Sequence, residues 1–488
     1  MLPLLRIDRG RLAAALALTL VAPLAQAVHL NPRGHGQVLI FPYYTANAGY
    51  TTLLSLVNDS AQAKALKLRF HEGHNGRVVF SANLYLAAHD VWTGGVFATA
   101  GGHAALVTDD NSCAVPDLRN APGLPELPDG RSYTPFSTAD FTGARADGGP
   151  DDAARTREGH VEVIEMGKLS GSSAQAATFT LQNGRLHPRA CAQLLDAWRP
   201  AGYWAVDAST DVAAPGGGLY GNATVVDVAD GVVFTLPATA LDGFSVRSQH
   251  SAPDSAHPNL ADAVSDTASG AATAYVGLGT RTVSATYPAS RAVDAVSAVL
   301  ATAYSAGESV WSHSSDALTE WVLAAPTKRF YVDPTLQNAG LGGAPFHARI
   351  GDQSGGRACQ QYPGDYRLIR HDRSTDTMID FGTPAPQSAL CYDTTVVAVG
   401  GPHQGTQSPV LGSRTQNTVG AFEEGTLSFE WATASAPAQN GEQFRGLPVI
   451  GWQLVNYFNG NVGGVMSNYS AVAPLRGDAI CRRGESDC

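Results

Sequence analysis

Hydrophobic and polar residues alternate with a period of two from residue 37 to about residue 96, and this is the clearest pattern in the sequence. Four runs carry it, each bounded by Gly, Asn, Asp or Ser: QVLIFPYY, TTLLSLVN, ALKLRF and RVVFSANLYL. Successive side chains of a strand point to opposite faces, so this period predicts strands. Several short strands at this spacing predict an antiparallel β-sandwich of the immunoglobulin-like kind.

The run ALKLRF shows what the alternation implies for one strand. Its apolar positions are Leu66, Leu68 and Phe70, and its polar positions are Lys67, Arg69 and His71. An antiparallel sheet commonly packs one face on a core and leaves the other face in water. We therefore expect the apolar side chains of this strand to be buried and the polar ones to face solvent.

The segment HEGHNG, residues 71–76, joins this run to the next one. Gly73 and Asn75-Gly76 supply the positive backbone φ angles that a tight reversal requires, which predicts a β-hairpin. The alternative is a metal site, because His71 and His74 flank a glutamate. A zinc-protease helix needs its histidines four residues apart, and a site at a hairpin tip needs a third ligand from elsewhere. We interpret the segment as a turn and assign no metal site to it.

The rest of the chain alternates between loop-like and strand-like segments. Residues 114–156 are rich in Pro, Gly and Asp and lack a sustained apolar period, which predicts a long crossing loop. Strand patterns return in HVEVIEMG, TEWVLAAPTKRFYVD, TTVVAVG, TLSFEWATA and LPVIGWQLVNYFNGNVGGVMSNYS. Helical spacing of apolar residues predicts two helices, one from Cys191 to Trp198 and one within residues 290–305.

These patterns predict a mainly β protein, with an N-terminal immunoglobulin-like antiparallel β-sandwich and a larger β-rich domain that includes a few short helices. The predicted segments are a signal peptide at 1–27, the β-sandwich domain at 28–112, a loop or linker at 113–156, the larger β-rich domain at 157–475 and a Cys-containing tail at 476–488.

The N-terminal segment has the three-part layout of a secretory signal. Three arginines precede the apolar run LAAALALTLVAPL, and AQA at residues 25–27 offers a small-residue cleavage site. An uncleaved N-terminal anchor is the alternative. No later apolar run is long enough to cross a bilayer, so we expect no transmembrane segment after cleavage. The formal net charge of −11 argues against a nucleic-acid partner, because a phosphate backbone attracts basic proteins.

Six cysteines follow the predicted signal, namely Cys113, Cys191, Cys359, Cys391, Cys481 and Cys488. An even number of cysteines in an exported chain predicts disulfides. We expect the sequential pairing, 113 with 191, 359 with 391 and 481 with 488, because it closes the shortest loops. Zinc binding is the alternative, but no two cysteines lie two to four residues apart, which is the usual spacing of zinc ligands.

No catalytic motif is complete. GDQSGG around Ser354 differs from a serine-protease GDSGG by one extra residue, so we interpret it as a Gly-rich turn. Glu162 and Glu165 are three apart on a predicted strand and point to opposite faces, so they do not flank one glycosidic bond. Glu320 and Glu430 lie on predicted strands without any sign that they converge. We predict no catalytic residue, no cofactor and no metal.

Aromatic residues at two loops are the remaining indication of binding. They are Tyr43, Tyr44 and Tyr50 in FPYYTANAGY, and Tyr457 and Phe458 in NYFNGN. Such rings stack on sugars or fill pockets on partner proteins, and the alternative is packing in the core.

Several motifs resemble those of a family of exported proteobacterial β-rich proteins that are often labelled cell-surface proteins. They are GQVLIFPYYTANAGYTTLLSLVN, NLYLAAHDVWTGGVF, REGHVEVIEMG, PTKRFYV and GLPVIGWQLVNYFNGNVGGVMSNYS. The resemblance covers most of the chain after residue 27 and implies export, but it transfers no catalytic residue.

The sequence therefore predicts an exported non-enzymatic protein, periplasmic, cell-surface or extracellular. It acts by binding or assembly, and its candidate partners are a cell-surface component, a glycan or further copies of itself. The first alternative is a secreted hydrolase of polysaccharide or polyester, and the second is an outer-membrane-associated protein.

Overall fold

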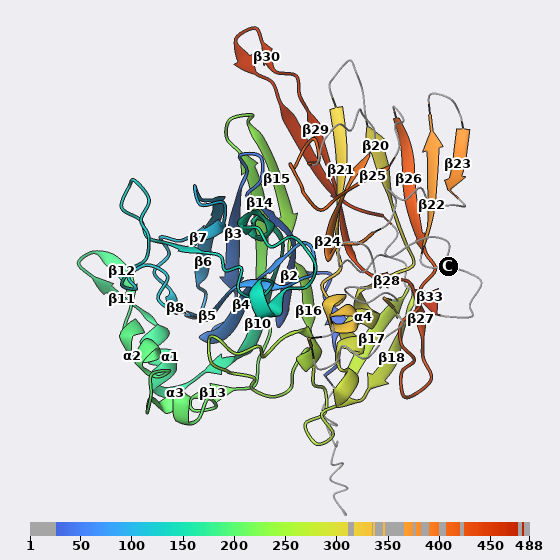
Figure 1. The fold of residues 1–488 in the computed structure, drawn as a ribbon. Helices are drawn as coiled ribbons and strands as arrows, with labels where there is room; N and C mark the ends of the chain where they lie inside the picture. The colour runs from blue at the N-terminus through green and yellow to red at the C-terminus, as the bar shows by residue number, and fades with distance from the viewer. Residues whose placement is uncertain are drawn as a thin grey trace, which may run out of the picture.

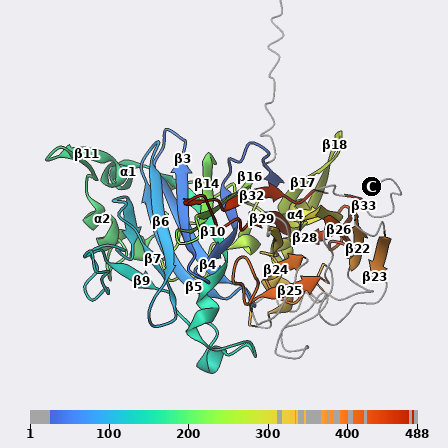
Figure 2. The same cartoon turned by 90° about the horizontal axis from the view of Figure 1, so that it is seen from above.

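Two pairs of β-sheets dominate the structure, one built from residues 29–242 and one from residues 304–474 (Figure 1). The structure is a computed structural model and describes residues 26–310, 317–333, 335–336, 345–346, 366–373, 377–381, 390–399, 407–419, 424–476 and 481–482. The two pairs lie side by side, as the view from above also shows (Figure 2). The mainly β fold with antiparallel sheets and a few short helices is thereby confirmed.

The first pair of sheets, here called the first sandwich, packs an eight-stranded sheet against a six-stranded one. In the eight-stranded sheet the order is β1 (His29–Leu30), β16 (Thr239–Asp242), β2 (Val38–Thr45), β10 (Glu158–Leu169), β4 (Lys64–Glu72), β5 (Val78–Leu86) and β8 (Cys113–Val115), with β13 (Val212–Ala213) beside β10. In the six-stranded sheet the order is β15 (Val232–Pro237), β14 (Leu219–Asp227), β3 (Thr51–Asn58), β6 (Val91–Ala98), β7 (Ala104–Val107) and β9 (Tyr133–Pro135).

The first sandwich extends far beyond residue 112. β10 lies between β2 and β4 and is antiparallel to both, while β14 and β15 continue the facing sheet. The strands of residues 158–242 therefore belong with residues 28–112, whereas the sequence analysis had placed them in the larger domain. The reason is physical: alternation identifies a strand, but hydrogen bonds with strands about a hundred residues earlier decide its sheet.

The second pair of sheets, the second sandwich, holds the C-terminal half. One sheet contains β20 (Tyr304–Val310), β26 (Glu424–Trp431), β22 (Tyr366–Asp372) and β23 (Thr377–Phe381). The other contains β25 (Gln416–Val419), β24 (Thr394–Val399), β21 (Ala317–Ala324), β29 (Ile450–Tyr457) and β32 (Tyr469–Pro474), with β24 and β25 parallel. Smaller two-stranded pairs are β11 (Phe179–Gln182) with β12 (Arg185–Pro188), β17 (Ala272–Leu278) with β18 (Arg281–Tyr287), β19 (Ala301–Thr302) with β28 (Leu447–Pro448), β27 (Phe444–Arg445) with β33 (Cys481–Arg482), and β30 (Asn461–Val462) with β31 (Val465–Met466).

The helices are short and lie beside the sheets. They are α1 (Gly171–Ala177), α2 (Cys191–Asp196), α3 (Tyr203–Val206), α4 (Val293–Leu300) and α5 (Arg329–Val332), with 3-10 turns at Gly143–Arg145, Ala153–Arg157, Leu260–Asp262 and Ala289–Arg291. Both predicted helices are present, as α2 and α4. In the described part of the chain, no helix has the length and apolar character needed to span a bilayer.

One disulfide joins Cys113 in β8 to Cys191 at the start of α2, with their Cα atoms 5.3 Å apart. The first of the three predicted pairings is therefore confirmed. Cys391 is also disulfide-bonded. Cys359 and Cys488 lie outside the described residues, and Cys481 lies in β33. The other two pairings stay predictions.

The eight-stranded sheet is buried on both faces. Leu39, Leu68 and Val163 pack toward the six-stranded sheet. Ile40 and Ile164 belong to a different core, which contains α4 and side chains of the second sandwich. The expectation of a solvent-facing side on β4 is therefore wrong, because every residue of that strand is buried. Residues 245–262 cover this side of β4. The Lys67 and Arg69 side chains donate hydrogen bonds to backbone carbonyls of that segment, so their polar groups stay satisfied.

Candidate functional site

The predicted hairpin at residues 71–76 is confirmed, because β4 pairs with β5 in antiparallel register. Glu72 organises its turn. The Glu72 carboxylate accepts hydrogen bonds from the backbone N–H groups of His74 (2.8 Å), Asn75 (3.0 Å) and Arg77 (2.9 Å). Gly76 has a φ of 72°, as the sequence predicted, whereas Gly73 and Asn75 do not have the positive φ angles that were also expected. The turn is thus held by a fully buried carboxylate.

Arg155 neutralises this buried carboxylate. Its guanidinium donates to both oxygens of Glu72, at 2.8 and 3.0 Å, and to both oxygens of Asp147, at 2.8 and 2.5 Å. Burial raises the pKa of Glu72, but attraction to Arg155 outweighs this and leaves the pKa below its ordinary value. Burial also raises the pKa of Asp147, but the hydrogen bonds and the charge of Arg155 lower it more, and the pKa falls to about 2. Both carboxylates are therefore ionised at neutral pH.

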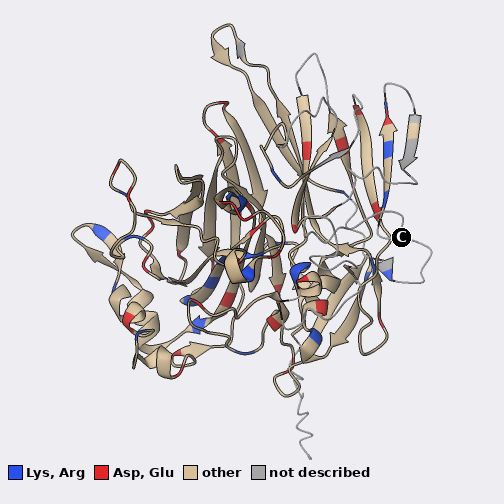
Figure 3. Ribbon diagram, in the orientation of Figure 1, with Lys and Arg blue, Asp and Glu red and all other residues tan. Residues whose placement is uncertain are grey.

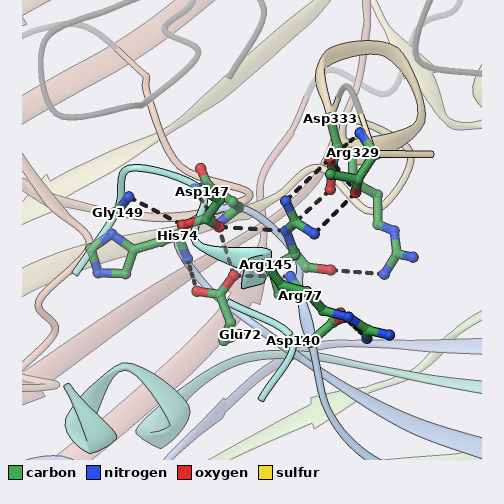
Figure 4. A network of polar contacts seen from close by, with 12 residues as sticks. Glu72, His74, Arg77, Asp140, Arg145, Asp147, Gly149, Arg329 and Asp333 are labelled. Atoms are coloured by element: carbon green, nitrogen blue, oxygen red, sulfur yellow. Dashed lines mark hydrogen bonds and ion pairs between the residues drawn. The ribbon is translucent and has the colours of Figure 1, made fainter. Parts of the chain in front are cut away.

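The same hairpin contacts the second sandwich through charged groups and backbone (Figure 4). Arg77 pairs with Asp333 at 3.1 Å, and Arg329 donates to the Gly76 carbonyl at 2.8 Å. The backbone N–H groups of Asp393 and Thr394, before and at the start of β24, donate to the carbonyls of His74 and Gly73 at 2.9 Å. The turn is therefore a junction between the two sandwiches.

Beside this junction, two buried imidazole rings face one carboxylate. His71 on β4 is the register partner of His160 on β10, and their rings stack with centroids 4.7 Å apart. The Nε2 atom of His71 lies 3.2 Å from Glu162, and the Nε2 atom of His160 lies 3.5 Å from the other oxygen of Glu162. The donor atoms of these three side chains, here called the His71–His160–Glu162 cluster, lie within 4.8 Å of one another.

The Nδ1 atoms of both rings lie close to further polar groups. Nδ1 of His71 is 3.0 Å from the Gly76 carbonyl and 2.8 Å from Nη1 of Arg329, and Nδ1 of His160 is 2.9 Å from Asp393. Burial lowers the pKa of His160, but the charge of Asp393 and contacts with Glu162 raise it to about 9 overall. Both rings, Glu162 and Asp393 are buried. Figure 3 shows the basic and acidic positions on the neighbouring strands β4 and β10.

The outward face of the six-stranded sheet carries a different feature, a groove of about 610 Å³. Gly95 of β6 lies between its register partners Leu53 of β3 and Val107 of β7. Because Gly95 has no side chain, the row across these three strands is interrupted and a hollow opens above β6. Further lining side chains are Thr51, Ser55, Thr93, Phe97, Thr108, Asp109, Leu127, Arg131 and Thr224.

The predicted binding-loop aromatics fall in two different environments. Tyr43 and Tyr44 lie in β2 and are completely buried, with hydroxyls that donate to Glu158 and to the Thr156 carbonyl. Tyr50 is also buried, at 4% exposure. These three rings contribute to the core, which was the alternative reading. Tyr457 and Phe458 are half-buried at the end of β29.

The serine and the glutamates that the sequence analysis considered as catalytic residues are not brought together in the described part of the chain. Ser354 lies outside the described residues. Glu165 pairs with Lys64 at 2.7 Å, whereas Glu162 faces the two histidines, so these two glutamates have different partners. Glu320 in β21 accepts hydrogen bonds from Val410, Leu411 and Ser408, and burial raises its pKa to about 7. Glu430 pairs with Arg367 near the surface.

Sequence reasoning missed the partners that make the junction, namely Asp147, Arg155, Arg329, Asp333 and Asp393. Asp147 lies in the acidic crossing loop that looked solvated, yet it is 8% exposed. One signal was available: only 15% of residues are charged, yet β4 and β10 each concentrate charged and histidine residues. Charges so concentrated on two strands indicate mutual pairing.

Comparison with known proteins finds no matching family model, no matching curated protein and no matching solved structure.

Proposed function

We propose that this protein is exported and acts without catalysis, by binding a glycan at the cell surface in the groove above Gly95. The observation that carries the proposal is the groove itself, which is wide, open and lined by short hydroxyl side chains between apolar ones. The immunoglobulin-like kind of the first sandwich, the signal peptide and the export of the chain are parts of the same proposal.

The lining chemistry suits a sugar chain. Hydroxyls of Thr51, Ser55 and Thr93 can exchange hydrogen bonds with sugar hydroxyls, since each is both donor and acceptor. The apolar floor from Leu53 and the ring of Phe97 suit the C–H faces of a pyranose. This combination of an apolar surface with a few polar groups is typical of ligand sites.

The small number of carboxylates at the groove favours binding over hydrolysis. Glycoside hydrolases use two carboxyl groups on either side of the scissile bond. Among the described residues that line the groove, Asp109 supplies the one carboxylate, and it lies 3.5 Å from Arg131. A binding role needs no second acid.

Gly95 provides the test. A Cβ atom built there would lie 3.5 Å from Val107 and 3.6 Å from Leu53, which are ordinary contacts, so a side chain can begin at this position and Gly95→Val extends it into the groove. Valine also suits a strand. The purified chain is screened on a glycan array, and hits are measured by isothermal titration calorimetry. We expect Gly95→Val to lower affinity at least about tenfold, which is about 1.4 kcal/mol of binding free energy.

The matched control is Gly277→Val on β17, where a Cβ meets no atom within 4 Å. This variant should bind like the wild type. If no glycan binds, or if both valine variants bind equally well, the proposal fails. Release of reducing sugar from a bound glycan would instead support the hydrolase alternative.

A further inference from the structure

We propose that His71, His160 and Glu162 form a buried site for one divalent transition-metal ion of the zinc class at the junction of the two sandwiches. The inference is independent of the groove, which lies on the outward face of the other sheet.

The donor set suits such an ion. Two imidazole nitrogens and one carboxylate oxygen are ligands that Zn²⁺ accepts, and the three donor atoms already lie within 4.8 Å of one another. Cross-strand pairing brings His71 and His160 together, and His160 and Glu162 are two apart on β10, so their side chains share one face. The sheet itself therefore assembles the cluster.

The donor atoms are buried without hydrogen bonds. All three side chains are at most 1% exposed, and Nε2 of both rings and both oxygens of Glu162 have no hydrogen-bond partner within the part of the chain that is described. The nitrogen–oxygen distances are those of ion pairs, but the geometry directs no N–H group at an oxygen. Buried polar atoms are nearly always satisfied, and an ion bound to these atoms would satisfy them.

Each ring has a polar group near its second nitrogen, as a metal-binding histidine does. Such a ring holds its second nitrogen against a carboxylate or a backbone carbonyl, which orients the ring and makes the first nitrogen a better donor. His160 has Asp393 at 2.9 Å from Nδ1, an ion pair without hydrogen-bond geometry, and His71 has the Gly76 carbonyl at 3.0 Å. Metal binding requires the tautomer of His71 in which Nδ1 carries the proton and donates to the Gly76 carbonyl. In this tautomer Nδ1 and Nη1 of Arg329 are both donors, so the 2.8 Å contact between them has to lengthen when the ion binds.

The ion also connects the two sandwiches. The three ligands belong to the first sandwich, whereas Asp393, which orients His160, immediately precedes β24 of the second. Each Nε2 lone pair lies in the plane of its ring, and the two ring planes are parallel. The rings therefore have to tilt toward each other before both nitrogens can bind one ion. Their Nδ1 contacts change with the rings, so occupancy of the site is coupled to the junction.

The test uses the full chain with its disulfides intact. The protein is unfolded in guanidinium with a chelator and without reductant, and is then refolded either with Zn²⁺ or with chelator. We expect one equivalent of zinc per chain by mass spectrometry and a higher melting temperature with zinc, since a ligand that binds only the folded state stabilises it. Refolding with Co²⁺ should give the visible absorption of a tetrahedral site.

Variants locate the ion. His71→Gln should lower zinc affinity by more than about 100-fold, and Asp393→Asn, which affects orientation alone, by about 10- to 100-fold. The control is His250→Gln, which removes a buried imidazole whose Nδ1 contacts the Ala208 carbonyl, and it should keep full zinc binding. If His71→Gln does not fold, Asp393→Asn and the Co²⁺ spectrum of the wild type still decide. Equal melting temperatures with and without zinc, or equal zinc binding by all variants, would show a metal-free polar cluster and overturn the proposal.

Discussion

Replacing Arg155 with methionine tests how much the buried charges hold the junction together. Arg155 is among the largest completely buried side chains and makes four hydrogen bonds to Glu72 and Asp147. Methionine keeps much of the volume but removes the guanidinium. The Glu72 carboxylate then keeps its three backbone N–H donors but loses its cation, and Asp147 keeps Asn75 and the more distant Arg77.

The expected cost follows from leaving two carboxylates in the interior without their main cation. Breaking a buried ion pair by removing one partner typically costs about 3–5 kcal/mol, because the remaining charge is desolvated and uncompensated. Arg155→Met should therefore lower the free energy of unfolding by about that amount. Such a loss is a large part of the stability of an ordinary protein domain.

Urea unfolding followed by circular dichroism measures this loss, because urea does not screen charges. The matched control is Arg131→Met, since Arg131 also pairs with two aspartates but is 44% exposed. Its unfolding midpoint should equal that of the wild type within error. In the double variant with Glu72→Gln, the loss should be smaller than the sum of the two single losses, because the charge left behind by one change is removed by the other. Equal midpoints for Arg155→Met and Arg131→Met would refute the reasoning.

Two further predictions concern the disulfide and a buried acid, and two others accompany the groove and the metal cluster above. The Cys113→Ala, Cys191→Ala double variant should lose about 4 kcal/mol of unfolding free energy in guanidinium, since the bond closes a loop with a sequence separation of 78; an unchanged midpoint would contradict this. Glu320 titrates at about pH 7 when folded and near its ordinary 4.5 when unfolded, so the folded state binds more protons between these values and stability falls as pH rises through that window. Glu320→Gln should flatten this part of the stability–pH curve in thermal melts, and an equally steep curve would show that other groups cause it.

Local structure was largely predictable from the sequence. Most strands, the 71–76 hairpin and helices α2 and α4 follow from alternation, turn residues and helical spacing. These signals act over a few residues, so they survive whatever the rest of the chain does. The half-buried pattern of β26, with Leu427 and Phe429 buried beside the less buried Ser428 and Glu430, is one example. The prediction was wrong for the second half of TEWVLAAPTKRFYVD, where Arg329–Val332 form helix α5 and not a strand.

The contacts that make the candidate site were not predictable in the same way. Alternation separates the two faces of β4, but it does not reveal what covers each face, and here the cover comes from residues nearly two hundred positions later. The partners of the hairpin lie at Asp147, Arg155, Arg329 and Asp333, on a loop and on short turns without periodicity. Long-range pairing of this kind is set by the topology of the sheets, and a single sequence does not display it.

The account depends most on the claim that the polar face of β4 and β10 is sealed from solvent by the second sandwich and by residues 245–262. Hydroxyl-radical footprinting with mass spectrometry measures this directly, because oxidation of a histidine ring requires solvent access and not a particular charge state. His257, whose side chain is 64% exposed, should be oxidised readily, while His71 and His160, at 1% and 0%, should stay protected until the protein unfolds. Oxidation of His71 or His160 at the rate of His257 in the folded protein would contradict the account.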